Sequence, residues 1–339
     1  MKKVLAILLI LALTVPVLFA NGQTEKTSTK EAEKLELMVY TSMKENLIGA
    51  LRDAFLEKYP NVSFDYYSAG AGKLMAKIAT ERQAGGVACD VLWTSEVPDF
   101  IGLKSEGVLK AYLSPERKNV VSTIDDPEGY FTAARLGTLG IAYNTNLIKN
   151  PPKTWEDLLK PEYKNNFSIA NPALSGTSMV SVGMLIENFG WDYIQKLADN
   201  GCRMGQGSGQ VVDDTAAGDV AACIGVDYIT IDKIVKGATL GFCYTDKMLV
   251  VPSPVAIMAQ TKNEKASQLF VDFLLSSDGQ KIIANAYTLP VREDVPVRTD
   301  LGLIDPEAAK ARALQLDYAA LGTNKAAYID KFTAIIQNK

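Results

Sequence analysis

The chain has 339 residues, of which 47% are hydrophobic, a net charge of −4 and no histidine. Its length suits two domains of ordinary size, and its acidic balance argues against nucleic acid or an anionic membrane surface as a partner. The lack of histidine excludes histidine-based catalytic triads, imidazole metal sites and histidine general bases.

The first 20 residues have the layout of a secretory signal peptide. Lys2 and Lys3 precede an apolar run from Val4 to Leu13, which is too short for a membrane-spanning helix. Residues 21–34 are polar without an apolar period, which predicts a flexible leader. Removal of residues 1–20 would change the net charge from −4 to −6, because two lysines are lost.

The four cysteines are Cys89, Cys202, Cys223 and Cys243. An exported protein could oxidise them, and their spacing matches no metal site. Cys89 and Cys223 lie in strand-like runs that favour buried thiols, whereas a disulfide from Cys202 to Cys223 or Cys243 remains open.

The first third of the chain alternates between strand and helix patterns. Apolar strands are expected at 35–40, 62–67 and 89–93, and each is followed by a loop with serine, threonine or glycine and then by a helical period. This alternation predicts a parallel, doubly wound sheet. Ligands bind beyond the carboxyl ends of the strands in such sheets, so the three loops should meet at one edge.

An apolar segment near 136–144 contains Gly137 and Gly140 and predicts a strand that crosses to a second lobe. The βα pattern then repeats, with strands expected at 167–170, near 202–204 and at 219–226. A return crossing is expected at 250–258, followed by a helix from Ala266 and a helical tail from 305.

The loop 171–178 lies between the expected strand 167–170 and a helical period that starts at Met179. Ser175, Gly176 and Thr177 would lie at the N-terminus of that helix, where unpaired N–H groups and the helix dipole attract anions. An ordinary N-cap without a ligand explains this loop alone equally well. The further hydroxyl- and glycine-bearing loops, including Gly205–Gln210 with Ser208, favour an anion site.

The order of these segments resembles the periplasmic substrate-binding proteins of ABC importers, in the two-lobed branch that holds ferric-ion, thiamine, aminoethylphosphonate and sugar-phosphate binders. The match covers nearly all of residues 35–295. It is carried by Asp90–Trp93, Gly140–Asn144, Lys153–Leu159 with Pro161–Lys164, the loop 171–178, Ala217–Ala221 and Ala266–Gln280.

The resemblance implies an α/β fold of two doubly wound lobes joined by two crossing hinge strands, the type II periplasmic binding protein. Residues 35–137 with 254–304 would form the first lobe, 138–253 the second, and 305–339 helices that pack across both. It further implies a monomer in the periplasm, without cofactor, that delivers its solute to an ABC permease in the inner membrane.

The hydroxyl-rich loops favour a small phosphorylated or phosphonate ligand, above all a sugar phosphate. Trp93 could stack on the ligand, although such an indole more often packs in the core, and Asp227 could accept hydrogen bonds from sugar hydroxyls or a ligand ammonium. Lys73 could touch the phosphate, although a first-turn lysine is more often solvated. The expected ligand-binding residues are Ser42, Gly70, Gly72, Trp93, Thr94, Ser175, Gly176, Thr177, Ser208, Asp227 and Tyr228.

Two alternatives remain. Ferric binders of the family present a histidine, a carboxylate and adjacent tyrosines, whereas this chain offers Asp227-Tyr228 and no histidine, so iron is less favoured than phosphate, phosphonate, a thiamine-like cation or a polyamine. A secreted phosphate-ester enzyme is the alternative from another class, but the sequence has no nucleophile elbow, Walker loop or metal-ligand cluster.

Overall fold

The computed structural model describes residues 34–121 and 126–337, so the predicted signal peptide and nearly all of the leader lie outside the described residues. The strands are β1 (Leu35–Thr41), β2 (Val62–Ser68), β3 (Val91–Trp93), β4 (Leu109–Lys110), β5 (Thr132–Asn144), β6 (Phe167–Ala170), β7 (Arg203–Gly205), β8 (Ala222–Val226), β9 (Leu240–Cys243) and β10 (Leu249–Met258). The α-helices are α1 (Glu45–Lys58), α2 (Ala71–Gln83), α3 (Val97–Ser105), α4 (Gly176–Asp199), α5 (Ser208–Ala217), α6 (Asp227–Val235), α7 (Glu264–Leu275), α8 (Ser277–Asn285), α9 (Pro306–Ala311) and α10 (Tyr318–Gln337). Short 3-10 helices are η1 (Pro115–Asn119), η2 (Trp155–Leu159), η3 (Pro161–Tyr163) and η4 (Thr299–Leu301).

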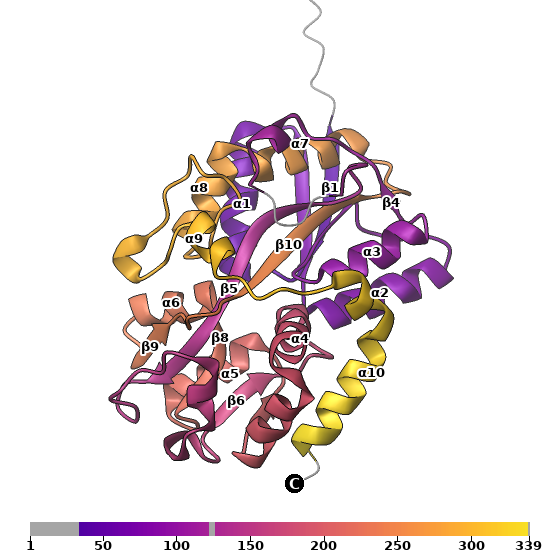
Figure 1. The fold of residues 1–339 in the computed structure, drawn as a ribbon. Coiled ribbons are helices and arrows are strands. Elements are labelled where there is room, and N and C mark those ends of the chain that lie inside the picture. The colour runs from indigo at the N-terminus through magenta and orange to yellow at the C-terminus, as the bar shows by residue number, and fades with distance from the viewer. Residues whose placement is uncertain (1–33, 122–125, 338–339) are drawn as a thin grey trace, which may run out of the picture. The chain divides into compact units, whose positions relative to one another are not determined.

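The strands form one sheet with the order β2-β1-β3-β10-β5-β8-β6-β7, in which β4 also pairs with β10 and β9 with β5. β1 is parallel to β2 and β3, and β6 is parallel to β7 and β8. The long strands β5 and β10 run antiparallel to each other and to their other neighbours. The sheet is therefore mixed, with a parallel set at each end and two crossing strands between them (Figure 1).

Each parallel set is the centre of one lobe. The first lobe holds β1–β4 with α1, α2, α3, α7 and α8, and the second holds β6–β9 with α4, α5 and α6 (Figure 1). The buried side chains separate in the same way, since Phe55, Phe64 and Phe270 pack in one cluster and Trp155, Phe167 and Ile194 in another. The two parallel sets thus pack against different hydrophobic clusters.

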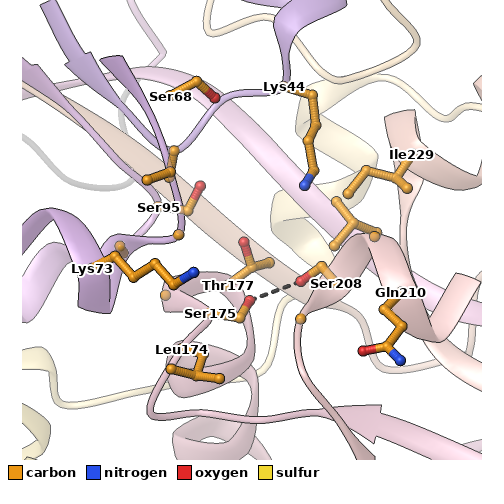
Figure 2. A pocket seen from close by; sticks show the side chains of 18 of the residues that line it. Lys44, Ser68, Lys73, Ser95, Leu174, Ser175, Thr177, Ser208, Gln210 and Ile229 are labelled. Atoms are coloured by element: carbon orange, nitrogen blue, oxygen red, sulfur yellow. Dashed lines mark hydrogen bonds between the residues drawn. The ribbon is translucent and has the colours of Figure 1, made fainter.

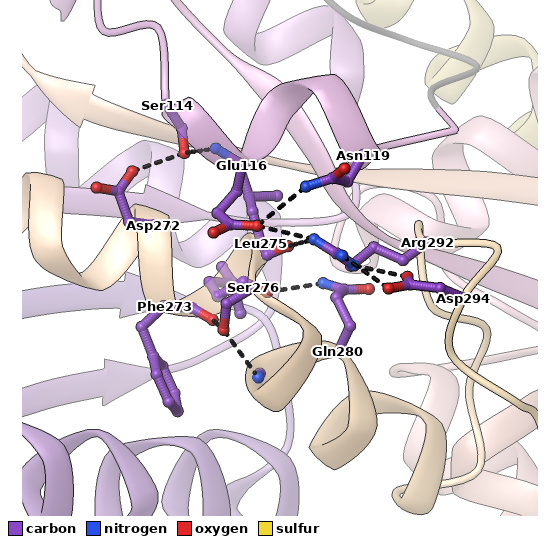
Figure 3. A network of polar contacts seen from close by, with 12 residues as sticks. Ser114, Glu116, Asn119, Asp272, Phe273, Leu275, Ser276, Gln280, Arg292 and Asp294 are labelled. Carbon is purple, nitrogen blue, oxygen red and sulfur yellow. Dashed lines mark hydrogen bonds and ion pairs between the residues drawn. The ribbon is translucent and has the colours of Figure 1, made fainter.

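The first lobe is assembled from two distant segments of the chain, and a polar network joins them (Figure 3). The Asp272 carboxylate on α7 accepts hydrogen bonds from the hydroxyls of Ser114 at 2.6 Å and Tyr112 at 2.9 Å. Arg292 is mostly buried and forms ion pairs with Glu116 and Asp294, each at 2.8 Å. These charge-assisted contacts fix the returning segment against residues 112–116, which follow β4.

α4 is bent at Gly190, whose φ of 78° is left-handed and makes a kink between two helical segments. α10 packs against α4 and against α3. Within 34–121 and 126–337, no helix combines the length and apolar character needed to cross a membrane.

Candidate functional site

A cavity of about 470 Å³ lies where the carboxyl ends of the first-lobe strands face the helix starts of the second lobe. From the first lobe it is lined by Ser42, Lys44, Tyr67, Ser68, Gly70, Lys73 and Ser95, among others. From the second lobe it is lined by Leu174, Ser175, Gly176, Thr177, Gln206, Ser208, Gln210, Tyr228 and Ile229, among others (Figure 2).

Five helices begin at this cavity. The residues that precede their first turns all line it, namely Lys44 for α1, Gly70 for α2, Ser175 for α4, Gly207 for α5 and Val226 for α6. The first N–H groups of a helix have no partner within that helix, and the dipole places partial positive charge there. These helix starts therefore place backbone donors around the cavity that suit an anion, although at α6 the N–H of Tyr228 already donates to the Asp227 carboxylate.

Side-chain hydroxyls add to these donors. The Ser175 hydroxyl accepts from the N–H of Ser178 at 3.3 Å and lies 2.8 Å from the hydroxyl of Ser208, which joins the starts of α4 and α5. The Ser42 hydroxyl is buried, and no described residue is its hydrogen-bond partner. The side chain of Thr177 points into the same space (Figure 2). A buried hydroxyl without a protein partner costs stability unless a ligand or water forms a hydrogen bond with it.

Two lysines are the charged residues of the lining. Lys44 enters the cavity from the top of the view and Lys73 from the left (Figure 2), and neither forms an ion pair with a residue of 34–121 or 126–337. No aspartate or glutamate is among the described residues that line the cavity. The charged lining is thus wholly positive.

Glycines allow the two lobes to approach each other beside the cavity. A Cβ atom at Gly70 would lie 2.4 Å from the carbonyl oxygen of Leu174, and one at Gly72 would lie 2.3 Å from that of Ala173. A Cβ at Gly176 would lie 2.9 Å from the Cβ of Ala71. Any larger residue at these positions would separate the start of α2 from the loop before α4.

Four of the predicted site residues do not line the cavity: Gly72, Trp93, Thr94 and Asp227. Trp93 is fully buried and its indole N–H donates to the carbonyl oxygen of Ser253 at 3.2 Å, because β3 lies in the middle of the sheet between β1 and β10. Thr94 is fully buried beside it. Gly72 contributes through its contact with Ala173 instead.

Asp227 is completely buried and serves the crossing strands. One carboxylate oxygen accepts from the N–H and hydroxyl of Thr138 at 3.0 and 2.9 Å and from the hydroxyl of Thr288 at 3.0 Å. Burial raises the pKa of Asp227, while the charge of Arg135 and these donors act in the opposite direction. The structure thus holds the carboxylate in protein hydrogen bonds and away from the cavity lining.

Tyr228 lines the cavity but is held from two sides. The Arg135 guanidinium lies over its ring, 4.7 Å from the centroid, and the backbone N–H of Lys44 donates to its hydroxyl. Burial raises the pKa of Tyr228, which disfavours a phenolate. In the described part of the chain, no three Cys, Asp or Glu side chains are grouped as metal ligands.

The expected ligand-binding residues leave out several that line the cavity, chiefly Lys44, Tyr67, Ser68, Ser95, Gln206 and Gln210. Ser68 ends β2 and Ser95 follows β3, so both lie where the rule that ligands bind beyond strand ends places the site, and Gln206 and Gln210 lie in the loop 205–210 that the sequence already associated with an anion. The direction of the Lys44 side chain has no such signal, because a residue before a helix usually faces water.

Cys223 and Cys243 are free thiols, so neither forms the disulfide with Cys202 that the sequence left open. Burial raises the pKa of both thiols to about 12. They are therefore unreactive structural side chains.

A buried ionic cluster lies behind the cavity. Lys325 of α10 contacts Glu96 at 2.5 Å and Asp99 at 2.7 Å, and the Glu96 side chain packs against Gly176 at the start of α4. Burial, with repulsion from Asp99, raises the pKa of Glu96 to about 8. The Lys325 ammonium acts on this pKa in the opposite direction, and its contacts with Glu96 and Asp99 tie α10 to the start of α3.

Comparison with known proteins finds a matching family, related sequences and similar folds. The sequence profile of the family described as "Bacterial extracellular solute-binding protein" matches residues 97–320. An uncharacterized protein of Haemophilus influenzae is 27% identical over 272 residues, which cover 74% of this chain and 75% of the relative. A putative 2-aminoethylphosphonate-binding periplasmic protein of Salmonella typhimurium is 24% identical over 72% of this chain and 73% of its own length.

Among solved structures, the periplasmic binding protein AfuA from Actinobacillus pleuropneumoniae with bound fructose-6-phosphate superposes with a TM-score of 0.80. It is 24% identical, and the superposition covers 91% of this chain and all of that one. This likeness confirms the predicted fold class.

Proposed function

Because this chain belongs to the bacterial extracellular solute-binding protein family, we propose that it captures a small phosphorylated or phosphonate solute between its lobes, with a sugar phosphate favoured. It then delivers the solute to an ABC permease in the inner membrane. The periplasmic names of its relatives support a periplasmic location, and the predicted signal peptide agrees with it.

The observation that carries the proposal is the convergence of five helix N-termini on one cavity without carboxylates among its described lining residues. A phosphate group is stabilised by many hydrogen-bond donors, and a neighbouring carboxylate would repel its charge. The Ser42, Ser175 and Thr177 side chains offer hydroxyls from both lobes, so closure would surround the group with donors.

The same lining disfavours a cationic ligand. A thiamine-like cation or a polyamine would meet Lys44 and Lys73 and no carboxylate of the described lining. A ferric ion would find the buried Tyr228 beneath Arg135 and a carboxylate, Asp227, already engaged with Thr138. The relatives are binding proteins, which supports capture over catalysis.

The experiment is calorimetric titration of purified protein with glucose 6-phosphate, 2-aminoethylphosphonate, inorganic phosphate, thiamine and ferric citrate. We expect binding of the phosphorylated or phosphonate compounds and none of thiamine. Thr177→Ala and Ser42→Ala should each weaken that binding about tenfold to a hundredfold, since each removes a hydrogen bond to a charged acceptor. Ser105→Ala, which alters an exposed hydroxyl on α3, is the matched control.

Tight binding of thiamine or ferric citrate, with no binding of any phosphate or phosphonate compound, would overturn the proposal. Release of phosphate from glucose 6-phosphate by the pure protein would support the enzyme alternative instead.

A further inference from the structure

The helix starts around the cavity fall into two groups, and each group has its own lysine. α2 and α4 meet where Gly70 approaches Leu174, and Lys73 lies in the first turn of α2. α1 and α5 meet where Lys44 reaches across the lobes, its Nζ lying 3.3 Å from the place of a Cβ at Gly209. The two ammonium groups thus lie at different sides of one cavity (Figure 2).

Nothing else in the described part of the cavity neutralises these charges. Lys44 also borders a shallower pocket of about 270 Å³ that contains Asp213 and Asp232. Each of these carboxylates is already in an ion pair, Asp213 with Lys233 and Asp232 with Lys236. The cavity therefore keeps two separated positive charges, each beside helix N-termini that already attract anions.

We propose that the natural solute carries two separate anionic groups, a phosphate or phosphonate bound at Lys73 and a second anion, such as a carboxylate, bound at Lys44. This inference rests on the proposed function and narrows its ligand class to phosphorylated acids or bisphosphates. Solutes with a single anionic group leave Lys44 unpaired, and zwitterions place an ammonium group in a positive field. The cavity, at about 470 Å³, is much larger than a single phosphate group and has room for a solute with two anionic groups.

The test uses pairs of compounds that differ only in a carboxylate replaced by CH₂OH. These are 6-phosphogluconate against sorbitol 6-phosphate, and 3-phosphoglycerate against glycerol 3-phosphate. Calorimetry at constant pH and salt should show the acid of at least one pair binding ten times or more tighter than its alcohol, as expected for a gained charge-assisted contact.

Variants of the two lysines test which anionic group each lysine binds. Lys44→Met should abolish the preference for the acid while changing the affinity of the alcohol less than threefold, and Lys44→Arg should keep most of the preference. Lys73→Met should weaken both members of the pair tenfold or more and leave their ratio unchanged. Lys58→Met removes an exposed charge from the last turn of α1 and should change neither affinity. Thermal melts of each variant verify that it is folded.

Equal affinities of acid and alcohol in the parent for both pairs, or a preference that survives Lys44→Met, would overturn the inference and leave the proposed function intact. Failure of every phosphate and phosphonate compound to bind would overturn both.

Discussion

Asp227 accepts hydrogen bonds from Thr138, Thr288 and the N–H of Tyr228, all inside the protein. In Asp227→Asn, an NH₂ group would replace one of the carboxylate oxygens that accept these hydrogen bonds. The substitution would also remove the negative charge that faces Arg135. Asp227→Asn should therefore lower the free energy of unfolding by about 2–4 kcal/mol. Urea unfolding measures this loss, and calorimetry of the folded variant should show nearly the parent affinity. A variant of parent stability with a large loss of affinity would instead make Asp227 a ligand-binding residue.

Glu96 should make stability depend on pH. Its pKa is raised from 4.5 to about 8, first by burial and then by Asp99, so the folded protein holds this proton more tightly than the unfolded chain does. The free energy of unfolding should then fall as pH rises between these values, by up to about 1.4 kcal/mol per pH unit from this group. The glutamine of Glu96→Gln does not titrate, so in this variant the free energy of unfolding should fall less as pH rises.

Urea unfolding at pH 5.5 and 8.5 measures the Glu96 effect. Glu57→Gln, which changes an exposed glutamate on α1, is the control. An identical decline in the parent and in Glu96→Gln would contradict the assignment.

For single residues, the sequence predicted the positions of hydrogen-bond donors better than the positions of charged side chains. Ser42, Ser175 and Thr177 line the cavity because strand ends and helix starts are readable from apolar periods. Asp227 begins α6 next to the cavity-lining Tyr228, but its carboxylate turns to the crossing strands. The orientation of a side chain depends on distant partners such as Thr288, which no local pattern reveals.

At the scale of elements, the approach of α2 to the loop before α4 depends on Gly72. Its Cβ would lie 2.3 Å from the carbonyl oxygen of Ala173, so Gly72→Ala should prevent full closure and weaken ligand binding tenfold or more. The stability of the fold should stay level or rise by about 1 kcal/mol, because alanine favours a helix over glycine. Gly102→Ala is the matched control, since a Cβ there meets nothing within 4 Å. Unchanged affinity in Gly72→Ala would show that closure does not need this contact.

Most elements were predictable because their apolar periods are strong, and β6 (Phe167–Ala170) has the predicted bounds. The short strand β4 (Leu109–Lys110) was missed, because a strand of two residues has no period to detect. The pairing of β3 with β10 joins residues far apart in the chain, and no local pattern reveals it.

For the whole molecule, the crossing strands β5 and β10 are the proposed hinge. Their antiparallel pairing begins with Leu249 opposite Leu139, and its register shifts between Ser253 and Pro254. Ligand binding should close the lobes about 136–142 and 250–257, with Gly137 and Gly140 absorbing the change in backbone angles. Small-angle X-ray scattering should show a smaller radius of gyration with the bound solute. An unchanged radius at saturation would contradict this hinge.

The position of β10 in the first lobe has a consequence for how the chain acquires its fold. β3 pairs with β10, which is synthesised about 160 residues later, as the separation of Trp93 from Ser253 shows. Until residues 249–285 emerge, the first lobe lacks a central strand and the helices α7 and α8, and its sheet ends in an open edge. The first lobe of a nascent chain can therefore complete its sheet only after most of the chain has been synthesised, whereas the strands and helices of the second lobe are all present before residue 249.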